Sequence, residues 1–193
     1  FGDRTVPIGI SARHMHVTPE HLEILFGPGA KLTKMRDLTQ PGEFAANETV
    51  AVMGPNRRIF GKVRILGPTR DISQIELAFT DGVYLGMDLP HRISGDIKDT
   101  APITVIGPEG VLRLPEGAIR AMRHVHMNPE DAAQFGLKEG DRINVRTHGP
   151  ASITFNDVVV RIKEGLIRQM HVDTDEANAG GLDPHNAFGE MIF

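Results

Sequence analysis

The chain has 193 residues, 40% of them hydrophobic, which is enough to bury the core of one large domain or two small ones. Its net charge of −4, its pI near 6.1 and the lack of a basic run argue against a nucleic-acid-binding protein, and no apolar stretch approaches the length that spans a bilayer. Cysteine is absent, so disulfides, a cysteine nucleophile and thiolate-bound zinc are excluded, and a metal would be held by nitrogen and oxygen, for which nine histidines are available.

The N-terminal part of the chain predicts a strand that leads into a short helix. His14 and His16 lie in the extended segment, and Thr18 is a good N-cap for a helix whose first position is Pro19. Gly27 is a suitable residue for ending that helix, and Asn128 and Gly136 are the corresponding N-cap and helix stop after His124 and His126. The two histidines are therefore expected directly before a helix N-terminus.

Most of the remaining chain predicts short strands joined by turns. Turns that contain Gly and Pro separate apolar segments, and the Asp-Gly pair at residues 81–82 is typical of a β-hairpin. The predicted strands are residues 48–53, 58–65, 75–79, 83–87, 102–106, 111–114, 142–147, 153–161 and 168–173. Strands of this length and spacing favour small barrels over a parallel sheet, and no glycine-rich nucleotide-binding loop follows any of them.

The sequence contains an internal repeat. Residues 13–20, Arg-His-Met-His-Val-Thr-Pro-Glu, resemble residues 123–130, Arg-His-Val-His-Met-Asn-Pro-Glu. A weaker similarity relates residues 50–55 to residues 103–108. Repeats this far apart indicate two similar subdomains rather than an array of small units. We therefore expect a mainly β protein with short capping helices, built from two small β-barrel domains related by an internal repeat.

The two His-x-His pairs, His14 with His16 and His124 with His126, are the main candidates for chemistry. Residues i and i+2 of a strand face the same side, so each pair can present two imidazoles to one metal ion. A single pair would more often consist of surface or core histidines with ordinary hydrogen bonds. The same frame of an arginine, two histidines and a capped helix occurs twice, which favours metal binding at both places.

Each pair needs a third ligand, because a catalytic zinc ion has three protein ligands and an open position. His171 lies in an apolar strand pattern, and Glu76 lies between apolar residues, where a carboxylate is costly to bury unless it is paired or bound to metal. A solvent-facing Glu76 and a half-buried His171 with a backbone partner fit the spacing equally well. Arg70 could hold an oxyanion bidentately, although a surface ion pair with Asp71 is the simpler interpretation.

Five segments follow one another along nearly the whole chain in a specific combination. They are residues 10–18 (ISARHMHVT), 37–44 (DLTQPGEF), 66–70 (LGPTR), 123–127 (RHVHM) and 171–178 (HVDTDEAN). Together they resemble the phosphate propanoyltransferases of the PduL type, the phosphotransacylases of bacterial microcompartments. The resemblance implies two small β-barrels capped by helices and reversible transfer of a short acyl group, such as propanoyl or acetyl, between coenzyme A and inorganic phosphate.

The resemblance also implies an active site with two zinc ions. It assigns one zinc ion to His14, His16 and Glu76, and the other to His124, His126 and His171. Arg70 matches the phosphate-binding arginine of the family and would be the catalytic residue. Five further positions match residues near bound coenzyme A: Ser11, Arg36, Arg64, Leu66 and Asn178.

Domain limits and setting follow from the same resemblance. The first barrel with its capping helix would span residues 13–115, and the second would span residues 116–193 joined by the N-terminal strand 4–12. The expected partners are acyl-CoA, coenzyme A and phosphate, with no nucleic acid or membrane; a homodimer and neighbouring shell proteins or lumen enzymes are further expectations. The protein would act in a microcompartment lumen or the cytoplasm, and the N-terminal targeting helix that many family members carry is expected to be absent from this chain.

Two other functions would use the same residues. A two-metal hydrolase of thioesters or phosphoesters would activate water in place of phosphate. A non-catalytic metal-binding module would bind zinc without phosphate-dependent release of coenzyme A. Formation of acyl phosphate separates the acyltransferase from both.

Overall fold

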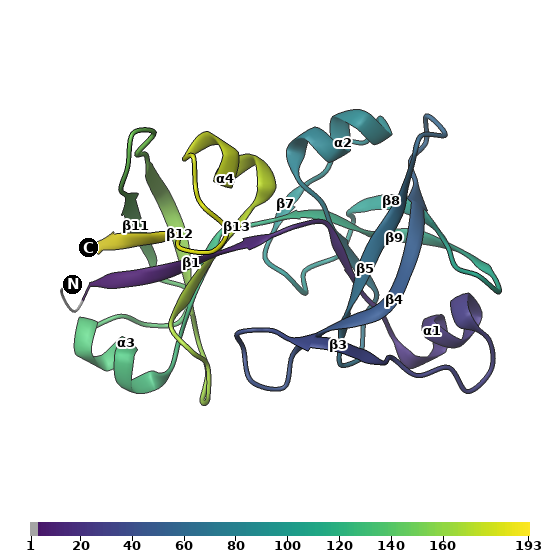
Figure 1. The fold of residues 1–193 in the computed structure, drawn as a ribbon, viewed down its shortest axis with the longest axis horizontal. Helices are drawn as coiled ribbons and strands as arrows, with labels where there is room; N and C mark the ends of the chain where they lie inside the picture. The colour runs from purple at the N-terminus through teal and green to yellow at the C-terminus, as the bar shows by residue number, and fades with distance from the viewer. Residues whose placement is uncertain (1–3) are drawn as a thin grey trace. The chain divides into compact units, whose positions relative to one another are not determined.

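The computed structural model describes residues 4–193, in which the chain divides into two compact units. The first unit comprises residues 12–121, and the second comprises residues 4–11 together with residues 122–193. In Figure 1 the N-terminal strand, drawn in purple, is part of the same unit as the green and yellow C-terminal strands. The predicted domain limits, 13–115 and 116–193 with the strand 4–12, stay a prediction.

The first unit is a closed six-stranded barrel with two short helices. Hydrogen-bonded neighbours follow the order β4, β5, β2, β6, β9 and β8, and β8 pairs with β4 to close the ring, while β3 and β7 lie beside β4 and β9. The strands are β2 (His14–His16), β3 (Lys34–Asp37), β4 (Phe44–Met53), β5 (Ile59–Gly67), β6 (Gln74–Glu76), β7 (His91–Arg92), β8 (Ala101–Ile106) and β9 (Val111–Ala121), and the helices are α1 (Pro19–Phe26) and α2 (Phe79–Leu85).

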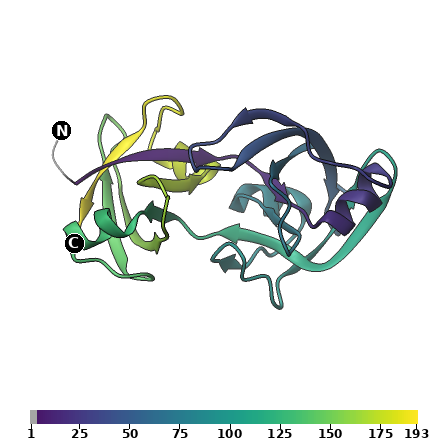
Figure 2. The same cartoon turned by 90° about the horizontal axis from the view of Figure 1, so that it is seen from below.

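The second unit is also a closed six-stranded barrel. Its strand order is β1, β13, β10, β12, β11 and β14, and β1 pairs with β13 in parallel and with β14 in antiparallel orientation. Figure 2 shows β1 running among the strands of the C-terminal part of the chain. The strands are β1 (Thr5–Ser11), β10 (His124–Met127), β11 (Arg142–Thr147), β12 (Thr154–Ile162), β13 (Gln169–Asp173) and β14 (Phe188–Ile192), and the helices are α3 (Pro129–Phe135) and α4 (Thr174–Ala179). The predicted mainly β fold with two barrels and short helices is confirmed.

Side chains alternate between the two faces of β2 and β10, so that apolar residues and histidines lie on opposite faces. Met15 is fully buried in the core of the first unit, and Val125 is fully buried in the core of the second. Because side chains alternate along a strand, the histidines on either side of each point to the opposite face. The apolar residues of β2 and β10 thus anchor each strand in its barrel and leave both histidines of the pair on one side.

The helices after the two histidine strands begin and end where the sequence predicts. Thr18 Oγ1 accepts a hydrogen bond from the backbone N–H of His21, and Asn128 Oδ1 accepts one from Asp131, which are N-cap bonds. Gly27 and Gly136 occupy the C-cap positions. No helix among residues 4–193 combines the length and the apolar character needed to cross a membrane.

The predicted hairpin over residues 75–79 and 83–87 is wrong, because residues 79–85 form helix α2. Asp81 is not a turn residue: its Oδ2 accepts a hydrogen bond from the backbone N–H of Ala78 at the start of the helix. Gly82 is buried in α2, and a side chain there would overlap Leu89. The Asp-Gly pair therefore starts a closely packed helix, which local turn statistics cannot distinguish from a hairpin.

Candidate metal centres and anion-binding arginine

The first candidate metal centre consists of His14, His16 and Glu76, whose ligand atoms all lie within 4.8 Å of one another. His14 and His16 lie on β2, and Glu76 lies on the antiparallel neighbour β6 directly opposite His14. The distance from Glu76 Oε2 to His14 Nε2 is 3.4 Å, and that from Glu76 Oε1 to His16 Nε2 is 3.8 Å. All three side chains are about nine-tenths buried, so the solvent-facing interpretation of Glu76 is excluded.

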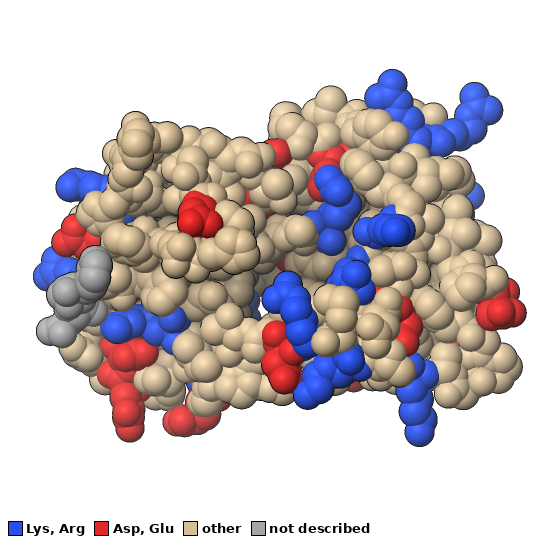
Figure 3. Space-filling model, viewed as in Figure 1, with Lys and Arg blue, Asp and Glu red and all other residues tan. Residues whose placement is uncertain are grey.

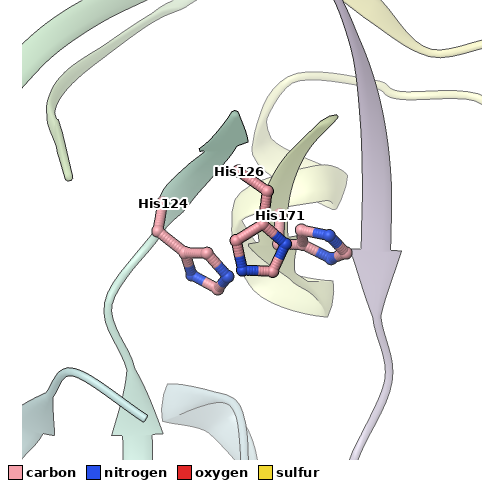
Figure 4. A group of neighbouring side chains, drawn as sticks. All are labelled: His124, His126 and His171. Carbon is pink, nitrogen blue, oxygen red and sulfur yellow. The ribbon is translucent and has the colours of Figure 1, made fainter. Parts of the chain in front are cut away.

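The second candidate metal centre consists of His124, His126 and His171, again with ligand atoms within 4.8 Å of one another. His124 and His126 lie on β10, and His171 lies on the antiparallel neighbour β13 directly opposite His124. The centroid of the His171 ring is 5.2 Å from that of His124 and 5.0 Å from that of His126. Figure 4 shows the three imidazoles turned toward one another. The two units thus build a triad in the same way, with one strand giving two histidines and its antiparallel neighbour giving the third group.

The first histidine of each pair has its tautomer set by the backbone. His14 Nδ1 lies 2.8 Å from the carbonyl oxygen of Ala12, and His124 Nδ1 lies 2.9 Å from that of Met122. A carbonyl oxygen only accepts, so Nδ1 carries the proton and donates in both rings. The lone pair of Nε2 is then directed to the triad, which is the arrangement that zinc-binding histidines use.

Charge interactions in the first triad place a positive charge on one histidine only. Burial opposes ionisation of His14, but the charge of Glu76 and its hydrogen bond outweigh burial and raise the pKa of His14 above 6.5. Burial and the neighbouring charges of His14 and Arg70 lower the pKa of His16 to about 3. Burial acts to raise the pKa of Glu76, yet the two histidines and the Ser94 hydroxyl hold it well below its usual range. A bound divalent cation would take over the role of the His14 proton.

Glu76 is held by a directional hydrogen-bond network. The backbone N–H of Gly95 donates to Gln74 Oε1 at 2.8 Å, which fixes the orientation of the amide. Gln74 Nε2 then donates to Glu76 Oε1 at 2.7 Å and to Ser94 Oγ at 2.9 Å. Ser94 in turn donates its hydroxyl hydrogen to the same Glu76 oxygen at 2.8 Å. Two donors therefore occupy Oε1, and Oε2 is the oxygen left for a metal.

Both triads fit a zinc ion by the chemistry of their donors. Imidazole nitrogen and carboxylate oxygen are normal zinc ligands, and three protein ligands leave one position open for substrate. Two ligands at about 2.0–2.1 Å from a tetrahedral zinc ion are about 3.4 Å apart, and the His14 Nε2 to Glu76 Oε2 distance has this value. The three nitrogen ligands of the second triad and the mixed ligands of the first both occur in catalytic zinc sites.

Arg70 lies close to the first triad. Its backbone N–H donates to the carbonyl of Val17, directly after the histidine strand. Its guanidinium charge helps to lower the pKa of His16 and partly opposes the rise in the pKa of His14. The guanidinium pairs with Glu43 at 3.1 Å, not with the Asp71 that the surface interpretation proposed. About a third of the Arg70 side chain is exposed, so an incoming anion can reach it.

The five residues matched to coenzyme A binding are divided between the units. Arg36 is exposed on β3, Arg64 lies on β5 beside His14 and donates to the carbonyl of Ala46 at 2.6 Å, and Leu66 is half-buried on β5. On the face drawn in Figure 3, basic side chains gather over the β3–β5 part of the first unit. Ser11 ends β1 and Asn178 lies in α4, both in the second unit.

Sequence reasoning missed Gln74 and Ser94. A signal for Gln74 exists, because Gln169 precedes His171 as Gln74 precedes Glu76, and the two glutamines stand opposite His126 and His16 in the strand registers. Aligning the third ligands of the two repeats would have brought the glutamines to the same place. No comparable signal points to Ser94, which comes from the loop after β7.

Comparison with known proteins relates nearly the whole chain to one family. The sequence model of a family described as phosphate propanoyltransferase matches residues 7–183. The chain is 53% identical to a phosphate propanoyltransferase of Planctopirus limnophila over 91% of this chain and 72% of that protein. It is 49% identical to one of Lachnoclostridium phytofermentans, covering 92% and 83%, and 40% identical to one of Salmonella typhimurium, covering 98% and 90%.

Proposed function

Because this chain belongs to the phosphate propanoyltransferase family and is therefore an acyltransferase, we propose that it transfers a short acyl group reversibly between coenzyme A and inorganic phosphate. The observation that carries the proposal is the pair of matching triads, one of them beside Arg70. Propanoyl and acetyl groups are the acyl groups that we propose. Each triad would hold one zinc ion, giving the two ions that the family resemblance implies.

Arg70 is the proposed phosphate-binding residue. A guanidinium presents a planar fork of donors that matches two oxygens of a phosphate, and its charge is permanent. Glu43 accepts a hydrogen bond from one of these donors, so a phosphate that binds Arg70 would replace a carboxylate there. A phosphate held in this way has lost most of the motional freedom that would slow attack on a thioester.

The transfer itself needs no covalent link to the protein. An oxygen of phosphate forms a bond to the acyl carbon while the carbon–sulfur bond breaks, and coenzyme A leaves as the thiolate. Zinc ions held by the two triads would supply Lewis-acid polarisation of the acyl carbonyl and a soft partner for the thiolate. His14, His16 and Glu76 would hold one ion, and the three histidines of the second unit the other. The absence of cysteine agrees with direct transfer, because no thiol is available to carry the acyl group.

Coenzyme A is proposed to contact Ser11, Arg36, Arg64, Leu66 and Asn178. The resemblance supports this assignment, and the basic side chains over the β3–β5 part of the first unit suit the phosphates of coenzyme A. We further propose two domains, residues 13–115 and residues 116–193 with the strand 4–12. Placement in a microcompartment lumen or the cytoplasm, a homodimer, and shell or lumen partners are proposed on the resemblance alone.

Release of coenzyme A, followed with a thiol reagent, tests the proposed reaction. Purified protein is incubated with acetyl-CoA or propanoyl-CoA, with and without phosphate, before and after removal of metal by a chelator. We expect release that requires phosphate, yields acyl phosphate, stops on chelation and returns with zinc. Release that continues without phosphate would instead identify a hydrolase, and zinc binding without any release would identify a non-catalytic module.

A matched pair of arginine variants tests the role of Arg70. Arg70→Lys keeps the charge and loses the fork, so the KM for phosphate is expected to rise about 10-fold or more, as a lost charge-assisted hydrogen bond implies. Arg92 is the control, because its side chain is 37% exposed against 36% for Arg70 and it also pairs with a carboxylate. If Arg92→Lys raises the KM for phosphate as much as Arg70→Lys does, Arg70 is not the phosphate site.

A further inference from the structure

Arg13, directly before the first histidine pair, is linked to the strand that carries the third ligand. Its guanidinium donates to Asp81 Oδ1 from two nitrogens, at 2.6 and 3.2 Å. The other oxygen of Asp81 accepts a hydrogen bond from the backbone N–H of Ala78 at 3.0 Å, two residues beyond Glu76. One carboxylate therefore connects the start of β2 with the end of β6. The Asp81 side chain is only 7% exposed, whereas that of Arg13 is 40% exposed.

The second unit contains the same link with different residues. Arg123, directly before the second histidine pair, donates to Glu176 Oε1 at 2.8 Å. Glu176 Oε2 accepts from the backbone N–H of Asp173 at 2.9 Å, two residues beyond His171. Again one carboxylate joins the residue before the histidine pair to the backbone just after the third ligand, although the acid is glutamate here and aspartate in the first unit.

The sequence separations around this link repeat between the units. Asp81 follows Glu76 at the separation at which Glu176 follows His171. Each arginine also lies against a phenylalanine: the Arg13 guanidinium is 4.2 Å from the ring centroid of Phe60, and that of Arg123 is 5.9 Å from the ring of Phe155.

The two phenylalanines stand at equivalent places as well. Phe60 precedes Glu76 at the separation at which Phe155 precedes His171. An arginine, an acidic residue and a phenylalanine thus occupy matching places in both units, although the third ligand differs. This repetition indicates that they have a role connected with the triads.

We propose that the carboxylate bridges Arg13–Asp81 and Arg123–Glu176 position the ligands of the two triads, so that each bridge sets the metal affinity of its own unit. This inference rests on the proposed metal role of the triads. In the first unit the paired strands that carry the ligands are short, since β2 and β6 have only three residues each. A metal site requires its donors to be held within about 0.5 Å of their productive positions. The bridge joins the residue before β2 to the backbone just after β6, at the end of the strand pair next to His14 and Glu76.

The alternative is that these acids only cap helices. Asp81 and Glu176 do accept from backbone N–H groups at the starts of α2 and α4. A cap of this kind needs no arginine, since the carboxylate alone satisfies the N–H group. The cap interpretation therefore predicts that loss of either arginine changes stability but not the geometry of the triads.

Zinc affinity of each triad, measured by competition with a chromophoric chelator, tests the proposal on the full chain. Two parent chains report one triad each: His124→Ala with His126→Ala leaves the first triad, and His14→Ala with His16→Ala leaves the second. Arg13→Gln and Arg123→Gln are then added to both parents. The d–d absorption of bound cobalt reports the ligand geometry in the same proteins. Lys34→Gln, which removes the exposed ion pair of Lys34 with Asp37, is the control for the loss of one paired charge.

We expect Arg13→Gln to weaken zinc binding by about 10-fold or more and to alter the cobalt spectrum in the parent with the first triad only. Arg123→Gln is expected to act in the same way on the second triad only. Unchanged affinity at the arginine's own triad, or equal weakening at both triads, would overturn the proposal. If a Gln variant does not fold, Arg13→Lys and Arg123→Lys decide by the same criterion.

The parent chains distinguish failure of the proposed metal role from failure of the bridge proposal. If neither parent binds zinc, the proposed metal role of the triads fails. If both parents bind zinc and the arginine variants keep that affinity, only the bridge proposal fails.

Discussion

At the scale of single residues, the first triad distributes its charge unequally between two neighbouring histidines. His14 faces Glu76 across the strand pair and has a raised pKa, whereas the pKa of His16 is lowered to about 3. Of these two histidines, His14 is therefore the one that binds a proton more readily. The Nδ1 proton of His14 is tied to the Ala12 carbonyl, so the proton that a metal must displace is the one on Nε2.

Proton release on zinc binding follows from this charge distribution. At pH 6.5, zinc binding to the first triad should release protons, because the metal replaces the His14 proton. Since the pKa of His14 is raised, zinc affinity should increase with pH until that pKa is passed and then level off. Calorimetry in buffers of different ionisation enthalpy, on the chain with His124→Ala and His126→Ala, measures the release. Binding without proton uptake by the buffer at pH 6.5 would contradict a protonated His14.

Gln74 is the second residue whose role can be measured. Gln74→Leu removes the amide that donates to Glu76 Oε1, and we expect zinc affinity of the first triad to fall about 10-fold, the usual loss for a group that orients a metal ligand. Ser94→Ala removes the other donor to the same oxygen and should act in the same direction. The second triad of the same protein is the internal control. Equal loss at both triads would indicate general destabilisation instead of a local effect on Glu76.

At the scale of elements, the weaker similarity between residues 50–55 and residues 103–108 marks two places where a helix end packs against a strand end. Gly54 follows β4 and lies against the Leu85 carbonyl at the end of α2, and Gly107 follows β8 and lies against the Leu25 carbonyl near the end of α1. A Cβ at either position would overlap a backbone oxygen. Both glycines are therefore required by close approach of the backbone and not by a turn conformation.

Alanine at these glycines should destabilise the first unit. Gly54→Ala and Gly107→Ala are each expected to lower the free energy of unfolding by about 1–3 kcal/mol, because a backbone carbonyl cannot move as a flexible side chain can. Urea denaturation measures the change. Gly61→Ala is the matched control on β5, where a Cβ meets no atom within 4 Å, and its effect should stay within about 1 kcal/mol. Equal effects at all three positions would show that close packing is not the cause.

At the scale of the whole molecule, each unit completes its triad from its own strands. The first triad uses β2 and β6 of the first unit, and the second uses β10 and β13 of the second unit. The N-terminal strand β1 belongs to the second barrel, although it directly precedes the first histidine strand in sequence. Metal binding by one triad therefore does not require the ligands of the other.

Zinc stoichiometry should show this independence. Elemental analysis of the purified protein is expected to find two zinc ions per chain, one for each triad. His14→Ala with His16→Ala, or His124→Ala with His126→Ala, should reduce the content to one ion and leave the remaining affinity within about twofold, as independent sites do. Loss of both ions from either double variant would contradict separate triads.

Local sequence patterns correctly predicted the helix caps within each repeat. Thr18, Asn128, Gly27 and Gly136 take the cap positions that their chemistry favours, because capping is decided by contacts within one helical turn. The hairpin expected around residues 81–82 failed because Asp81 bonds to Arg13, far away in sequence, and caps a helix instead. A window of neighbouring residues contains no information about that partner.

The two histidine pairs, the short helices after them and the β-rich character could be recognised from the sequence, and so could the acyltransferase class, through family resemblance. Periodicity and capping act over a few residues, so they can be read without a fold. The resemblance also named Glu76 and His171 as third ligands and joined the N-terminal strand to the second barrel. The fold was needed to show that the ligand atoms come together within each triad, and that Gln74, Ser94 and two arginine–carboxylate bridges surround them. These contacts join strands that are distant in sequence, and pairing between such strands is set by the packing of the whole barrel, which no local pattern records.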